Sequence, residues 1–394
     1  MTKGIVNWVL PCLLVAFSVP AQAGEIDDLK RRIDDLEAKM AKSDARQKRK
    51  LNSLQEDLKE AQQKLRISGF ATAGVTKSDS TFSTSDREFT EEFNYSSDTK
   101  AAVQLDYRMD EHWSATVQVM GRAYDEWDAE VEWAFVKYKY NEQLAFRAGR
   151  LRLPFYYYSE SLDVGFVYPW VRPPMPFYVT SISNYEGLDA NYRFATGDFT
   201  HEASAFVGAT KGTLPNGLSI DLEDLWGATY AINYYSLGFR LSAMTSDADL
   251  DFGGAFGLNN VSDRVGYYSA ALIYSGENLF LLAEASRSDT EMVIIRTSEA
   301  AQATVGYKWN RWMPYATYAT SRSMDNDDAK LLGGAVLPPA EADNSSFGVV
   351  LEASTQVNIK FQFDHFYNLG GGNPNFSGLK EGTDVYTINV NTIF

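Results

Sequence analysis

The last ten residues of the chain, VYTINVNTIF (385–394), alternate between apolar and polar side chains. Tyr386, Ile388 and Val390 fall on one face of this segment, while Asn389 and Asn391 fall on the other. A period of two residues is typical of a β-strand with one apolar and one polar face. The same pattern recurs from residue 66 to the C-terminus in about sixteen segments.

The predicted strands are joined by connections that alternate between short and long. We place the strands near 66–76, 99–108, 112–122, 130–140, 143–151, 185–195, 198–209, 224–234, 237–246, 264–274, 279–287, 299–308, 312–322, 345–354, 356–367 and 383–394. The long connections run roughly over 77–98, 123–129, 152–184, 210–223, 247–263, 288–298, 323–344 and 368–382. In outer-membrane barrels, short turns face the periplasm and long loops face outside. The sequence therefore predicts an all-β transmembrane barrel of about sixteen antiparallel strands over 66–394. Its apolar face should meet lipid, and water should fill its interior.

Composition and charge exclude several other classes of protein. The 394 residues include 36 Lys or Arg and 52 Asp or Glu, giving a net charge of −16, which argues against a nucleic-acid partner. Cys12 is the only cysteine, and there are three histidines. We therefore expect no metal site and no cofactor. The aromatic content of 14% excludes disorder of the whole chain.

The N-terminus has the pattern of an export signal over residues 1–23. Lys3 precedes an apolar run from Ile5 to Phe17, and Ala21-Gln22-Ala23 has the small residues of a cleavage site. The apolar run is too short to cross a bilayer as a helix. We expect a cleaved signal peptide and a mature chain that begins near Gly24.

Residues 24–65 predict a polar helix with one apolar seam. Ile26, Leu29, Ile33, Leu36 and Met40 are separated by steps of three and four residues, which is a heptad pattern. We favour a parallel coiled coil between identical chains. A single amphipathic helix lying on the barrel remains an alternative, and the seam taken alone leans towards two strands.

The whole chain resembles Gram-negative trimeric porins, and it is most similar to the DcaP-like, dicarboxylate type. The resemblance is carried by the signal, the coiled-coil segment, the run GRLRLPF at 149–155 and the terminal Phe394. It implies a homotrimer in the outer membrane, with the coiled coil in the periplasm. It also implies recognition of Phe394 by the barrel-assembly machinery. The implied function is passive diffusion of small hydrophilic solutes, including small carboxylates, without enzyme activity.

Alternation sorts the charged residues of each strand onto the lipid face or the pore face. The basic residues expected to line the pore are Arg108, Arg122, Lys137, Lys139, Arg147, Arg193, Arg240, Lys308 and Lys360. The acidic ones are Asp106, Asp189, Glu202, Glu284, Glu352 and Asp364. This excess of basic residues predicts a modest preference for anions. Alternation places Arg150 and Arg152 outward unless a bulge or the turn into the next loop reverses them, so both stay candidates.

The connection 152–184 is the candidate constriction loop. It is rich in Tyr, Phe, Trp and Pro, whereas an exposed loop is usually rich in Gly, Asn and Asp. Its apolar side chains could pack on the inner wall of the barrel, or on a neighbouring chain as a lid. Its charges are Glu160, Asp163 and Arg172. A loop carboxylate opposite wall arginines would produce a transverse field in the pore.

Four further features carry weaker hypotheses. The run DADLDFG at 247–253 resembles the start of a calcium loop, but its glycine is misplaced and Leu258 stands where a glutamate ligand belongs. Acidic loop tips such as 125–128 could contact lipopolysaccharide through divalent cations, although a solubilising role is the simpler interpretation. An outer-membrane hydrolase would need a serine, such as Ser204 or Ser269, paired with His201 or His365. A structural envelope tether through the coiled coil is compatible with a pore.

Overall fold

The computed structural model describes residues 23–84, 87–178, 182–213, 219–251, 261–290, 297–324, 340–370 and 376–394. The chain divides into two units, a helical one that ends at Gln63 and a β unit from Lys64 to Phe394. Most of the predicted signal peptide and part of the calcium-like run lie outside the described residues.

A single helix, α1 (Ala23–Lys64), occupies the segment predicted to be helical. Leu29, Ile33, Leu36 and Met40, which form the apolar seam, are each more than half exposed on the single chain. None of the described helices is both long enough and apolar enough to cross a membrane. The helix is confirmed, and its association into a coiled coil remains a prediction.

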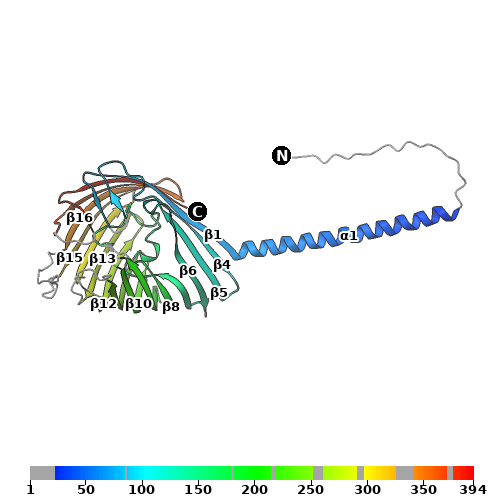
Figure 1. Cartoon of the computed structure of the whole chain (residues 1–394), viewed down its shortest axis with the longest axis horizontal. Coiled ribbons are helices and arrows are strands. Elements are labelled where there is room, and N and C mark those ends of the chain that lie inside the picture. Colours follow the sequence, from blue (N-terminus) through cyan, green and yellow to red (C-terminus); the bar gives the residue numbers. More distant parts are fainter. Residues whose placement is uncertain are drawn as a thin grey trace. The chain divides into compact units, whose positions relative to one another are not determined.

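Within the described segments, sixteen strands form a closed antiparallel barrel. Figure 1 shows the wall of this barrel from the side. The strands are β1 (Leu65–Ser78), β4 (Lys100–Arg108), β5 (Trp113–Arg122), β6 (Ala129–Lys139), β7 (Leu144–Arg152), β8 (Asn184–Thr196), β9 (Phe199–Thr213), β10 (Ser219–Tyr234), β11 (Leu237–Asp251), β12 (Val261–Ser275), β13 (Leu279–Thr290), β14 (Ser298–Tyr307), β15 (Trp312–Ser323), β16 (Glu341–Glu352), β17 (Val357–Tyr367) and β18 (Asp384–Ile393). Each overlaps one of the predicted strands, so the barrel prediction is confirmed.

The first and last strands of the barrel pair with each other and close the ring. Phe70 of β1 lies opposite Ile393 of β18, and the backbones of Gly69 and Phe394 exchange two hydrogen bonds. A Cβ atom on Gly69 would lie 2.5 Å from the ring of Phe394. Glycine at this position therefore leaves room for the terminal aromatic ring at the seam.

The two faces of the barrel have the predicted polarity, with apolar side chains outside. On β18, Ile388 is 48% exposed and Tyr386 is 47% exposed, while Asn389 and Asn391 are buried inside. A water-soluble protein has the opposite arrangement, because its apolar side chains fill the core. The outer surface of this barrel is thus suited to lipid.

Residues 210–213, 219–223, 247–251 and 261–263, which were predicted to lie in long loops, belong to strands, so these boundaries were wrong. The strand pairing extends as far as the partners Thr213 and Ser219, and as far as the partners Leu250 and Val261. Charged residues such as Asp221 replace the outward apolar side chains here and hide the alternation. A small two-stranded sheet, β2 (Phe82–Ser83) and β3 (Glu88–Phe89), lies in the first long connection and was not predicted.

Candidate functional site

The third loop, defined as residues 153–183 between β7 and β8, packs against the inner wall of the barrel. Trp170 is fully buried, and its Nε1 donates hydrogen bonds to the hydroxyls of Thr304 at 3.1 Å and Thr317 at 2.9 Å. Trp170 and Tyr168 belong to an apolar cluster with wall residues that include Leu282. The aromatic side chains of the loop thus find their packing partners inside the barrel.

Lys360 of β17 holds the backbone of the third loop. Its ammonium donates to the carbonyl oxygens of Gly165, Tyr168 (2.6 Å) and Trp170 (2.7 Å). Three acceptors match the three N–H donors of a lysine. Lys360 is 0% exposed, so this predicted pore residue lies behind the loop and does not face open water.

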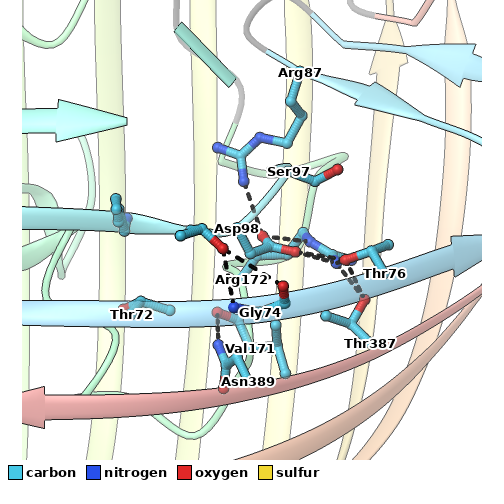
Figure 2. Close-up of polar contacts among 12 residues, drawn as sticks. Thr72, Gly74, Thr76, Arg87, Ser97, Asp98, Val171, Arg172, Thr387 and Asn389 are labelled. Carbon is cyan, nitrogen blue, oxygen red and sulfur yellow. Dashed lines mark hydrogen bonds and ion pairs between the residues drawn. The ribbon is translucent and has the colours of Figure 1, made fainter. Parts of the chain in front are cut away.

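Arg172 fixes the far part of the loop through a buried ion network, which Figure 2 shows in part. Its guanidinium pairs with Asp98 at 2.7 Å and with Asp364 at 3.0 Å. All three side chains are buried. Burial alone would raise the pKa of Asp98, but the charges of Arg172 and Arg87 hold the pKa of this carboxyl below its usual range. The network joins the first long connection (the first loop, 79–99), which contains Asp98, to Arg172 of the third loop and to Asp364 of the wall.

A second cluster surrounds Asp163 near the start of the loop. Lys100 pairs with Asp163 at 3.0 Å, Arg122 lies 3.6 Å from it, and Arg152 also contacts it. Burial alone would raise the pKa of the Asp163 carboxyl. The charges of Lys100, Arg152 and Arg122 outweigh that effect and hold the pKa well below its usual value. Three cations therefore surround one loop carboxylate, and a second carboxylate, Glu132, offsets part of their charge by pairing with Arg152 at 2.8 Å.

This depressed pKa predicts how acid affects the loop. A carboxyl of this kind stabilises the folded state fully above its unfolded pKa of about 3.9, and the contribution is lost as the pH falls through the folded pKa. We expect Asp163→Asn to unfold more easily than the native chain at pH 7, and this difference to narrow at pH 3. Guanidinium unfolding in detergent, with Asp128→Asn as an exposed-loop control, measures it. A difference that stays constant down to pH 3 would contradict the assignment.

The third arrangement places a loop carboxylate opposite a wall arginine. Arg147 of β7 contacts Glu160 of the loop at 3.1 Å and Asp189 of β8 at 2.6 Å. Glu160 is 54% exposed, whereas Asp189 is 5% exposed, so the loop carboxylate is the accessible partner. Arg240 of β11 donates to the carbonyl oxygen of Tyr157 at 3.2 Å, next to this pair. The sequence analysis anticipated such a pair of opposed charges.

The other predicted pore residues are spread over the barrel wall. Arg108 and Lys137 are exposed, and the strand register places Lys137 directly opposite Arg147. Arg193 pairs with Glu202 at 2.7 Å, and Lys308 pairs with Glu352 at 2.8 Å. All of these lie towards the short-turn ends of their strands.

Arg150 and Arg152 differ although simple alternation treats them alike. Arg150 pairs with Glu186 of β8 and remains partly exposed. Arg152 is buried and binds Glu132, the extra residue of a β-bulge in β6. The bulge turns the side chain of Glu132 away from its regular face. Arg152, the last residue of β7, contacts both Glu132 and Asp163, so it belongs to the Asp163 cluster, which the sequence analysis allowed but did not predict.

A cavity of about 520 Å³ opens beside the third loop. Its basic lining residues are Arg87, Lys100, Arg122, Arg150, Arg152, Arg172 and Lys211. Its acidic lining residues are Asp98, Asp125, Glu130, Glu132 and Asp163. The basic excess has the sign predicted for the pore wall.

The residues considered for a hydrolase have other partners. His201 bonds to Thr196 at 2.8 Å and to Tyr230 at 2.7 Å, and His365 bonds to Asp384 at 2.6 Å. The two serines considered with them are engaged elsewhere. Ser204 bonds to Thr229, and Ser269 bonds to the carbonyl oxygen of Phe155. These contacts do not form the serine–histidine pair that such an enzyme needs.

Comparison with known proteins identifies the class of barrel. No protein-family model and no curated protein sequence matches the chain. The solved structure of DcaP, an outer membrane channel of Acinetobacter baumannii, is 12% identical with a TM-score of 0.57, covering 84% of this chain and 97% of that one. An anion-selective porin from Comamonas acidovorans is 12% identical with a TM-score of 0.55, covering 84% and 99%. Salmonella typhi OmpF in complex with daunomycin is 17% identical with a TM-score of 0.57, covering 84% and 97%.

These structural neighbours are Gram-negative outer-membrane porins. At such low identities the likeness establishes the fold, and the chain has the closed sixteen-stranded barrel of that class. The resemblance to porins inferred from the sequence is confirmed at this level.

Proposed function

We propose that the protein is an outer-membrane porin through which small hydrophilic solutes diffuse, with a modest preference for anions such as small carboxylates. The observation that carries the proposal is a closed barrel with an apolar outside, whose polar interior is crossed by a loop bearing paired charges. The basic excess in the cavity beside the loop supports the sign of the selectivity. The structural neighbour named an anion-selective porin is consistent with it.

The location in a Gram-negative outer membrane is part of this proposal, as are the periplasmic coiled coil and assembly through Phe394. Lipopolysaccharide would surround the loop ends. A tether role for α1 can coexist with the pore. An enzymatic role is disfavoured by the hydrogen bonds that occupy His201, Ser204 and Ser269.

Ion selectivity is the direct test of the proposed pore. In planar bilayers with a potassium chloride gradient, we expect a reversal potential of the anion-selective sign. Glu160→Gln should raise the anion-to-cation permeability ratio about twofold or more, because it removes an exposed carboxylate from the constriction. Arg147→Gln should shift the ratio towards cations.

The matched control is Lys77→Gln. Thr76 and Ser78 on either side of this residue are buried, so Lys77 lies on the outer face of β1 and should leave the reversal potential unchanged. Clear cation selectivity of the native channel would reject the anion preference. Equal reversal potentials for the Glu160 and Arg147 variants would remove both residues from the constriction.

The exposed seam of α1, taken together with the resemblance to trimeric porins, leads us to propose that three chains associate through their helices. Leu36 is 59% exposed, and burying such side chains in a coiled coil stabilises association. We expect Leu36→Glu to lower the melting temperature of the trimer in detergent, and Glu37→Gln to leave it unchanged. Single-channel conductance should survive deletion of 25–65. Loss of conductance in correctly inserted protein would contradict this division of roles.

A further inference from the structure

A groove of about 800 Å³ lies on the outer face of the barrel, across strands β10 to β15. One row of the strand ladder supplies small side chains for its floor. Ala270 lies opposite Ala285, Ala285 opposite Ala301, and Ala301 opposite Thr320. Gln302, which follows Ala301 in the chain, is buried inside, so the alanine row points outward.

Large side chains border this floor and make it concave. Tyr230, Leu241 and Tyr268 line the groove and are each between one third and one half exposed. The groove is concave because its outward positions carry alanine, whereas the outward positions around it carry larger side chains. A depression of this size is within the range of sites that hold small molecules.

Charged residues form the rim of the groove on the side of the long loops. Arg287 lies opposite Glu299, which lies opposite Arg322, in the row next to the alanines. Arg287 donates to Asp289 at 2.6 Å and to Glu299 at 3.0 Å. Arg322 is 59% exposed, and its ion pair with Asp343 spans 4.0 Å. Arg322 is thus the more accessible of the two rim cations.

We propose that this groove binds an acyl chain of a phosphorylated lipid, with the lipid phosphate on Arg322. The proposal rests on the membrane location given under the proposed function. The apolar groove and the charged rim follow each other along the strands in the order of a lipid tail and its headgroup, and Arg322 is the rim cation less occupied by carboxylates. The concave alanine floor lets an acyl chain pack more closely than it can on the bulky surface around it, and a guanidinium group binds phosphate through two parallel hydrogen bonds.

A second copy of the chain is the rival occupant of this face. A protein partner would bury Arg287, Glu299 and Arg322 together, and removing such charges from water is costly. A lipid headgroup leaves them hydrated at the membrane surface. The charge row therefore favours the lipid.

Native mass spectrometry of the full chain in detergent tests the site. The probes are dimyristoyl phosphatidylglycerol, dimyristoylglycerol, which lacks the phosphate, and inorganic phosphate. We expect one retained phosphatidylglycerol per chain, held at least tenfold more tightly than dimyristoylglycerol, and no displacement by inorganic phosphate. The double variant Ala285→Leu/Ala301→Leu should lose this lipid, while Ala73→Leu, on the outer face of β1, should retain it.

A second variant tests the rim without altering the floor. Arg322→Gln should reduce the preference for phosphatidylglycerol over dimyristoylglycerol severalfold, and Arg264→Gln, an exposed arginine outside the groove, should not. Unchanged preference in Arg322→Gln, or full retention by the leucine variant, would overturn the proposal. A leucine variant that loses oligomeric mass but keeps its lipid would assign the groove to a second copy. If that variant does not fold, the Arg322 comparison still decides.

Discussion

Replacing Arg172 by Gln should destabilise the protein by about 3–5 kcal/mol, the usual effect of removing one partner from a buried ion network. The substitution leaves the carboxylates of Asp98 and Asp364 buried without the guanidinium that pairs with both. The third loop would also lose its link to the first loop. Guanidinium unfolding of the purified protein in detergent measures the change.

A matched control separates this effect from the loss of any arginine. Arg193 pairs with Glu202 at 2.7 Å but is 68% exposed, and an exposed pair contributes about 0–1 kcal/mol. Arg193→Gln should therefore change stability little. Adding Asp98→Asn to Arg172→Gln should restore part of the loss. If the Arg172 and Arg193 variants were equally stable, the buried network would have no structural role.

Replacing Lys360 by Met should free the third loop from the wall and raise single-channel conductance, roughly twofold if the loop sets the narrowest section. Methionine fills similar space but donates nothing to the carbonyl oxygens of Gly165, Tyr168 and Trp170. Each buried acceptor left without a donor costs about 1–3 kcal/mol. The carbonyl oxygens can regain hydrogen bonds from water if the loop moves away from the wall, so the substitution favours release of the loop.

Planar-bilayer conductance and limited proteolysis of the loop measure this release. Lys308→Met is the control, because Lys308 is 44% exposed and pairs with a wall carboxylate, Glu352, not with the loop. Unchanged conductance in a Lys360→Met channel whose loop has become sensitive to protease would show that the loop is not the constriction.

Alternation was sufficient to predict the barrel. Each lipid-facing residue of a strand such as β18 must be apolar, and each inward neighbour may be polar, so the period of two is imposed by the two solvents. The same rule would also have placed Lys100 inside, since it lies two residues before buried Ala102 on β4. The pattern was weakest where β10 and β11 extend beyond the apolar band, because lipid no longer restricts their outward residues.

The loop contacts could not be predicted in the same way. Lys360 was placed inward correctly by alternation, but nothing local indicates that three loop carbonyls cover it. Glu132 faces Arg152 because of a bulge, and a bulge leaves no clear trace in a single sequence. Asp98 meets Arg172 across 74 residues of chain. Such pairings depend on how the loop folds back, which is a tertiary property.

The pairing of β1 with β18 has a consequence for how the protein is made. Thr72 and Asn391 bond across 319 residues of sequence, so the ring closes only after nearly the whole chain is available. Contacts this distant in sequence are formed slowly, since a long loop must be ordered first. Until then both terminal strands expose unpaired edges, which attract other chains and promote aggregation. A newly made chain therefore needs protection from aggregation until β18 has been synthesised. A chain truncated before β18 would remain an open sheet, because β1 would have no strand with which to close the barrel.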